Sequence, residues 1–97
     1  MTAIGVIATL TVAAGKNAEF EAVFTELVSS VRANEPGNEF YSLTRSKTNP
    51  QVYKVLERYV DQAALDAHGK TDYFLAAGPK LAPCLAAAPD IEVLDAL

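Results

Sequence analysis

The sequence has little of several residue types on which common functional sites depend. Its 97 residues include one cysteine, one histidine and no tryptophan. One cysteine cannot form an intramolecular disulfide or a thiolate metal cluster, and one histidine among scattered carboxylates gives no metal-ligand spacing. We therefore expect no metal site. The scarcity of cysteine also fits a reducing cytoplasm, where we expect the protein to reside.

Basic residues and long apolar runs are scarce as well. Eight lysine and arginine residues lie scattered among twelve acidic ones, and the formal net charge is −4. Because phosphate binding needs clustered positive charge, we expect no nucleic-acid partner. No stretch approaches the roughly 20 apolar residues of a membrane span. Residues 1–12 lack the basic start and the unbroken apolar core of a signal peptide, so we expect neither a leader nor membrane association.

Hydrophobic residues, by contrast, are abundant. They make up 51% of the chain, slightly above the usual share of about 45–50%. The length favours a single domain, which we place at residues 1–97. A chain of this size can bury a core without disulfides or metals. We expect the apolar surplus to serve a dimer interface and a dry pocket.

The N-terminal part of the chain predicts a strand followed by an amphipathic helix. Residues 4–12 alternate with the period of two that is typical of a strand. A single apolar stripe at helical spacing then runs from Phe20 to Val31. Asn17 is the expected N-cap of this helix, and Pro36 with the glycine after it is expected to end the helix.

The remaining strands define the fold class. Residues 39–48 and 51–60 alternate on either side of a turn, and residues 91–94 form a last short strand. With a helix before the last strand, the order is β-α-β-β-α-β, a ferredoxin-like α+β fold with a four-stranded antiparallel sheet and helices on one face. The first and third strands carry large apolar groups on both faces. We therefore expect a second copy of the chain to cover the face without helices.

Two short helical segments are expected between the hairpin and the last strand. Asp61 is a suitable N-cap for the first, and Thr71 for the second. Within the second segment we expect Phe74 and Leu75 to face inward. The Gly-Pro pair at Pro79 is expected to break or kink it.

His68 is the first candidate for chemistry because it is the only imidazole of the chain. An unperturbed imidazole titrates at about pH 6.5, so it can accept a proton or donate a hydrogen bond to a bound oxygen. The alternative is a residue at the C-terminal end of a helix whose ring is satisfied by backbone carbonyls. Position alone favours this alternative.

Glu57 is the second candidate, because a carboxylate in the middle of an apolar strand is costly unless it is paired. Its expected partners are His68, Tyr41 or a basic residue such as Arg45. It either orients a histidine or polarises a substrate, or it makes a structural hydrogen bond that holds the following helix.

Four tyrosines complete the set of candidates for binding. They suit a pocket for flat, oxygenated ligands, and they equally suit the edge of a dimer interface. The four are Tyr41, Tyr53, Tyr59 and Tyr73. Cys84, between Pro83 and Leu85, is expected to be inert packing.

An ordered set of short motifs covers the middle of the chain. Glu35 begins Glu-Pro-Gly, Tyr41 begins a Tyr-x-Leu strand, and Glu57 begins a Glu-x-Tyr strand end. An Ala-x-x-x-His helix ends at His68, and a Thr-x-x-Phe segment ends at Phe74. In order and length the chain resembles the antibiotic biosynthesis monooxygenase (ABM) family of dimeric α/β barrels.

The resemblance implies a homodimeric barrel with one pocket per subunit between sheet and helices. Members of the family oxygenate polycyclic phenols or oxidise quinols with molecular oxygen, without metal, flavin or haem. By analogy, His68 or a tyrosine near it is the base or hydrogen-bond partner, and Glu57 orients it. The substrate-binding candidates are the four tyrosines named above.

The chain also departs from the family pattern. Tyr73 stands where relatives often have a second histidine, and Tyr59 where they often have tryptophan. The lack of tryptophan disfavours haem degradation, an activity of another branch. Two alternatives stay open: an isomerase of a small oxygenated metabolite, for which Arg45, Lys54 and Arg58 leave phosphate contacts open, and a non-catalytic ligand-binding or stress-response barrel.

Overall fold

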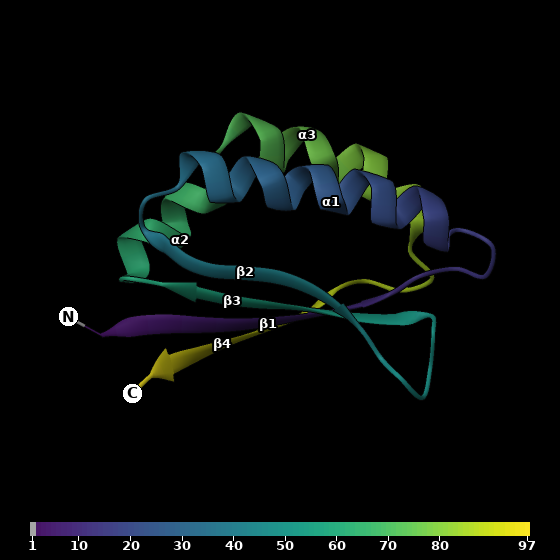
Figure 1. Cartoon of the computed structure of the whole chain (residues 1–97), viewed down its shortest axis with the longest axis horizontal. Coiled ribbons are helices and arrows are strands. Elements are labelled where there is room, and N and C mark those ends of the chain that lie inside the picture. The colour runs from purple at the N-terminus through teal and green to yellow at the C-terminus, as the bar shows by residue number, and fades with distance from the viewer. Residues whose placement is uncertain (1) are drawn as a thin grey trace.

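The predicted α+β arrangement is present in the computed structural model, which describes residues 2–97 (Figure 1). Compared with the prediction, the last strand is longer, and a short 3-10 turn follows the second helical segment. The elements are β1 (Ala3–Thr11), α1 (Asn17–Asn34), β2 (Asn38–Arg45), β3 (Val52–Tyr59), α2 (Gln62–His68), α3 (Asp72–Leu81), η1 (Ala82–Cys84) and β4 (Asp90–Ala96).

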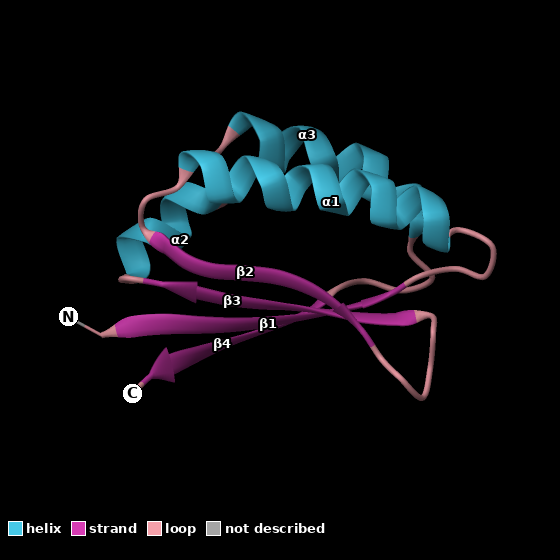
Figure 2. Cartoon of the chain, in the orientation of Figure 1, coloured by secondary structure: helices cyan, strands magenta, loops and turns pink. Residues whose placement is uncertain are grey.

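The four strands form one antiparallel sheet in the order β2-β3-β1-β4. Helices α1 and α3 lie side by side over one face of it, and α2 covers the end of the sheet near the N-terminus (Figures 1 and 2). The opposite face carries no helix. No helix within residues 2–97 is both long and apolar enough to cross a membrane.

The core fills the space between the sheet and the helices. Every second side chain of β1 from Ile4 to Val12 is buried, as the alternation predicted. On α1 the predicted stripe is buried as well, apart from the half-buried Val23, and Phe20 and Val31 are fully enclosed. The alternating side chains of β1 and the apolar stripe of α1 therefore pack together in a single apolar layer.

The predicted cap of α1 is wrong. Helix α1 begins at Asn17, so that Lys16 occupies the N-cap position, and no side chain there bonds to the helix. The side-chain amide of Asn17 instead donates to the Pro50 carbonyl and to the Tyr53 hydroxyl, each at 2.9 Å. Asn17 therefore ties the helix to the turn before β3 and does not satisfy the helix's own N–H groups.

Helix α3 also differs from its prediction. It continues through Pro79 to Leu81, because a proline this close to the end removes only one hydrogen bond of the last turns. Leu75, expected to face inward, is 59% exposed, and the buried residue of the helix is Ala77. Phe74 is 37% exposed, yet its ring contacts His68.

Much of the exposed apolar surface lies on β4, and not mainly on the helix-free face of β1 and β3 as expected. Ile91 and Val93 pair with Ala8 and Val6, so they face the helix side. They remain 55% and 53% exposed, because the helices lie over the other strands. This strand therefore borders an open space between the two layers.

Candidate functional site

A cavity of about 460 Å³ lies between the sheet and the helices. Small residues leave room for it, because Ala8 of β1 and Ala77 and Gly78 of α3 all line the cavity. Most of its wall is apolar and comes from β1, β3, α1 and α3. Ile91 lines it and is half exposed, so the cavity reaches the surface beside β4.

Three polar side chains line this cavity: His68, Glu57 and Tyr41. The Tyr41 ring lies 5.3 Å from the His68 ring, and Tyr41 pairs with Glu57 across the sheet, so the polar groups share one end. Sequence reasoning had selected all three. The cavity thus has one end that can bind oxygen atoms and long apolar walls, as small-molecule sites commonly do.

His68 is the last residue of α2 and is 4% exposed. The helix begins where the Asp61 carboxylate accepts a hydrogen bond from the Ala64 N–H, at 2.9 Å, as predicted. It ends where the Thr71 hydroxyl donates to the His68 carbonyl, also at 2.9 Å. Both ends of the short helix are therefore fixed, and with them the position of the imidazole.

The partner of the imidazole is Glu35, a residue that sequence reasoning noted only as part of a motif. His68 Nδ1 lies 3.0 and 3.1 Å from the two carboxylate oxygens of Glu35. A carboxylate accepts hydrogen bonds, so we assign the proton to Nδ1. Nε2 then carries a lone pair, and it has no hydrogen-bond partner within residues 2–97.

The turn after α1 brings Glu35 and His68 together. Glu35 is the first residue beyond the helix, and its N–H still donates to the Val31 carbonyl. Two residues later, a Cβ on Gly37 would lie 2.7 Å from the Ala64 Cβ. The glycine therefore allows α2 to approach this turn closely, which puts His68 within reach of the carboxylate.

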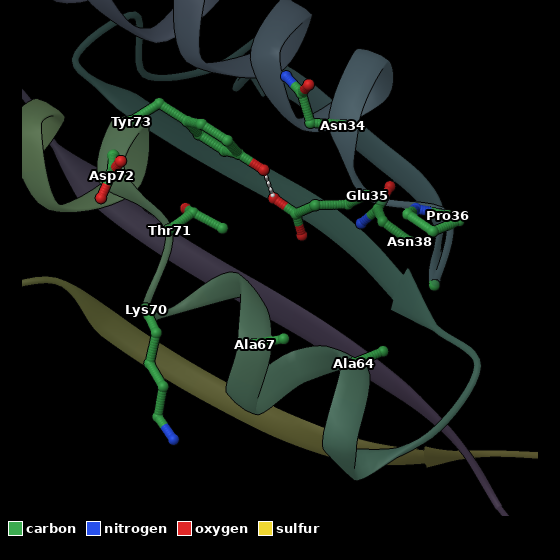
Figure 3. Close-up of a pocket in the computed structure, with 11 residues that line it drawn as sticks. Asn34, Glu35, Pro36, Asn38, Ala64, Ala67, Lys70, Thr71, Asp72 and Tyr73 are labelled. Atoms are coloured by element: carbon green, nitrogen blue, oxygen red, sulfur yellow. Dashed lines mark hydrogen bonds between the residues drawn. The ribbon is translucent and has the colours of Figure 1, made fainter.

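Tyr73 holds the other side of the same carboxylate. Its hydroxyl donates to Glu35 Oε2 at 2.5 Å, and Figure 3 shows the two side chains meeting. Burial, and then the hydrogen bond to Glu35, raise the pKa of Tyr73 to about 12, so the phenol stays protonated at neutral pH. Glu35 and Tyr73 line a second, more polar space of about 600 Å³ on the outside of the protein, which we call the outer groove.

Glu57 is bound by Tyr59 and not by the histidine. The Tyr59 hydroxyl donates to Glu57 Oε1 at 2.7 Å, and no hydrogen bond joins Glu57 to His68 in the described chain. Burial raises the pKa of Glu57, while the Tyr59 hydroxyl and the charge of His68 act in the opposite direction. The expectation that Glu57 orients His68 therefore does not match the hydrogen bonds, because Glu35 does so.

Aromatic rings enclose the imidazole. The rings of Tyr41, Tyr59 and Phe74 lie 5.3, 5.5 and 4.7 Å from that of His68. Burial, and then the charge of Glu57, raise the pKa of both Tyr41 and Tyr59. Both phenols are therefore neutral hydrogen-bonding groups at physiological pH.

Tyr53 lies apart from these residues. It sits at the other end of the sheet, where its hydroxyl donates to Glu21 and accepts from Asn17. It does not line the cavity. Cys84 is fully buried, and burial raises the pKa of its thiol. Both properties fit the predicted role as an unreactive packing residue.

Comparisons with known proteins agree with this architecture. The fold is that of a ferredoxin-like α+β protein, and the profile of the family described as antibiotic biosynthesis monooxygenase matches residues 3–80. The chain therefore belongs to the ABM family. No curated protein matches it.

Among solved structures, the chain is similar to one from Caulobacter crescentus described as "a putative antibiotic biosynthesis monooxygenase". Identity to that protein is 57% and the TM-score is 0.97, over 99% of this chain and 91% of that one. A conserved protein from Methanosarcina mazei is 29% identical, with a TM-score of 0.92 over 98% and 93% of the two chains. A protein from Pseudomonas aeruginosa is also 29% identical, with a TM-score of 0.85 over 100% and 96%.

Proposed function

We propose that the protein is a cofactor-independent monooxygenase that acts on a quinol or a polycyclic phenol with molecular oxygen. The observation that carries the proposal is the His68–Glu35 pair at the polar end of an otherwise apolar cavity. Membership of the ABM family and the name of the Caulobacter relative support the same reaction class.

Proton removal is the first step in this proposal. A flat substrate lies along the apolar walls with its hydroxyl, or an acidic C–H, toward His68. Nε2 takes the proton, and the Glu35 carboxylate stabilises the imidazolium through Nδ1–H. Neutral Tyr41, and Glu57 when protonated, can donate hydrogen bonds to the oxyanion that develops.

The substrate supplies the electrons for the oxygen step. The anion reduces molecular oxygen, one oxygen atom enters the product, and the other leaves as water with two hydrogens taken from the substrate. Atoms and electrons balance in this scheme without a further reductant. The apolar walls would keep other water away from the anion until oxygen has reacted.

We also propose that the protein is a homodimer joined through the helix-free face of the sheet. Phe40, Ile7, Leu56 and Leu94 lie on that face, and Phe40 and Leu94 are half exposed. Apolar side chains on an open sheet face favour a self-complementary contact. A monomer mass in light scattering at micromolar concentration would overturn this part of the proposal.

An isomerase of a small oxygenated metabolite is the second candidate. It is favoured by the position of Glu57 and His68 at one end of the cavity, where one group can remove a proton while the other delivers one. A phosphorylated substrate lacks support, since no lysine or arginine in the described chain lines the cavity. Arg45 pairs with Glu21 at 3.2 Å, and Arg58 with Glu39 at 3.0 Å.

Oxygen consumption tests the proposal directly. Metal-free protein is given a panel of quinols and anthrones, and we expect uptake that falls by about 100-fold or more in His68→Ala, the loss typical of a missing general base. Tyr53→Phe is the matched control and keeps its activity. Absence of uptake across the panel would falsify the oxygenase, and ligand binding without turnover would then favour a binding barrel.

A further inference from the structure

Glu35 is the one carboxylate of the site that lies between two separate spaces. On one side it binds His68, which lines the cavity. On the other side Glu35 and Tyr73 line the outer groove, whose wall also includes Asn38, Lys70 and Asp72 (Figure 3). The three linked side chains therefore span the wall that separates the interior from the exterior.

We propose that His68, Glu35 and Tyr73 form a proton route from the cavity to the outer groove. This inference rests on the proposed function, because that reaction deposits a proton on His68. The route would move the positive charge out of the cavity by a path that the substrate does not occupy, and it would return the proton when the second oxygen atom leaves as water. Without it, the imidazolium could lose its proton only through the cavity, where the bound substrate and apolar walls exclude water.

The hydrogen bonds give the order of transfers. After Nε2 has taken a proton, Nδ1 gives its own proton to one oxygen of Glu35. The carboxyl then passes a proton to the Tyr73 hydroxyl, which turns to accept it while giving its own proton to water in the groove. One proton has then crossed the wall, and His68 is neutral with its proton on Nε2. When Nε2 gives that proton to the oxygen atom that leaves as water, the reverse transfers return a proton to Nδ1 and restore the starting state.

The surroundings of Glu35 suit a carboxylate that takes up and releases a proton. Its side chain is 10% exposed and that of His68 is 6% exposed, so solvent has little direct access to the pair. The one cationic partner within 4.0 Å of Glu35 in the described chain is His68 itself. Within the described residues, no permanent positive charge therefore competes with His68 for the carboxylate.

The single histidine makes this route measurable without any substrate. In protein labelled with ¹⁵N at histidine, nitrogen NMR observes His68 alone and reports how fast its Nδ1–H exchanges with water. We expect exchange at least ten times slower in Glu35→Gln, because the amide accepts a hydrogen bond but cannot take up the proton. We expect Tyr73→Phe to slow exchange at least threefold.

Tyr53→Phe is the matched control, because it removes a tyrosine hydroxyl from a different glutamate. It should exchange at the wild-type rate. Should Glu35→Gln fail to fold, Tyr73→Phe decides alone. Wild-type exchange in Tyr73→Phe, or equal slowing in the Tyr53 control, overturns the route.

Activity measurements distinguish a failure of this inference from a failure of the proposed function. If wild-type protein consumes oxygen, Tyr73→Phe should turn over more slowly and regain its rate at high imidazole concentration, which a purely structural role would not produce. If no substrate is turned over, the proposed function fails, while the NMR experiment still decides whether the proton route exists.

Discussion

The two ends of helix α1 each hold a glutamate that accepts a hydrogen bond from a tyrosine hydroxyl. At the N-terminal end Glu21 binds Tyr53, and at the C-terminal end Glu35 binds Tyr73. The first glutamate is 41% exposed and also binds Arg45. The second is nearly buried and binds His68.

The difference lies in the third partner and in the access of water. Arginine keeps its charge at any physiological pH, and its ion pair with Glu21 links α1 to the hairpin. Histidine can act as both a proton donor and a proton acceptor, which suits the cluster around Glu35 to the proposed proton route. The same pair of residue types is structural in one place and suited to chemistry in the other.

Removal of each glutamate should give the largest contrast. In Glu35→Ala the His68 Nδ1–H and the Tyr73 hydroxyl lose their acceptor inside the protein, and we expect a loss of about 3 kcal/mol in the free energy of unfolding. In Glu21→Ala the exposed partners turn to water, and we expect about 1 kcal/mol or less. Urea denaturation measures both. Equal losses would contradict the proposed difference between the clusters.

Glu57 and Tyr59 form a third such pair, which tests the effect of burial on a carboxyl that forms no salt bridge within residues 2–97. The raised pKa of Glu57 means that the folded state holds this proton more tightly than the unfolded chain does. Its contribution to stability is therefore complete at low pH and is lost as the pH rises from about 4.5 through the folded-state value.

Glu57→Gln removes this dependence while the Tyr59 hydroxyl keeps an acceptor. We expect the variant to gain stability relative to wild type as the pH rises above about 4.5. Chemical denaturation at several pH values measures the gain. A difference between the two proteins that does not vary with pH would show that burial does not control this carboxyl.

The smallest effect is expected at the exposed ion pair. Arg45→Ala should cost about 0.5 kcal/mol, and the cost should shrink in high salt because both side chains are about half exposed. Thermal unfolding at low and high salt measures this. A large cost that is insensitive to salt would mean that the Glu21 cluster resembles the Glu35 cluster more than their burial indicates.

Most of the fold could be predicted from periodicity. The alternation in β1 and the stripe in α1 are long and regular, so tertiary packing had little to override. The wrong predictions concerned single residues whose role depends on tertiary contacts or on their exact position in a helix. Asn17 found partners across the chain, and Pro79 lay too near the end of α3 to stop it.

The site was predicted in part. Tyr41, Glu57 and His68 do meet at one cavity, but Tyr53 does not join them, although it shares a strand face with Glu57. Four residues along a strand span about 13 Å, which separates the two ends of the sheet. A shared face therefore does not make a shared site.

Glu35 was the residue that the sequence pattern could have revealed. It lies four positions after Val31, so it continues the apolar stripe of α1 by one more helical turn. A carboxylate on a buried stripe needs a partner, just as one in an apolar strand does. Because it stands directly before Pro36, Glu35 was noted only as part of the motif at the end of the helix, and its side chain was not considered as a buried group.

The position of the cavity mouth has a consequence for how the site can change in evolution. The groups of the proposed proton route come from the middle of the chain, from Glu35 to Tyr73, whereas the mouth is bordered by Ile91 of β4. Substitutions in this last strand can reshape the entrance without touching the polar end. The cavity entrance and the groups of the proposed acid-base chemistry therefore lie in separate stretches of the sequence, and the entrance can diversify while those groups are retained.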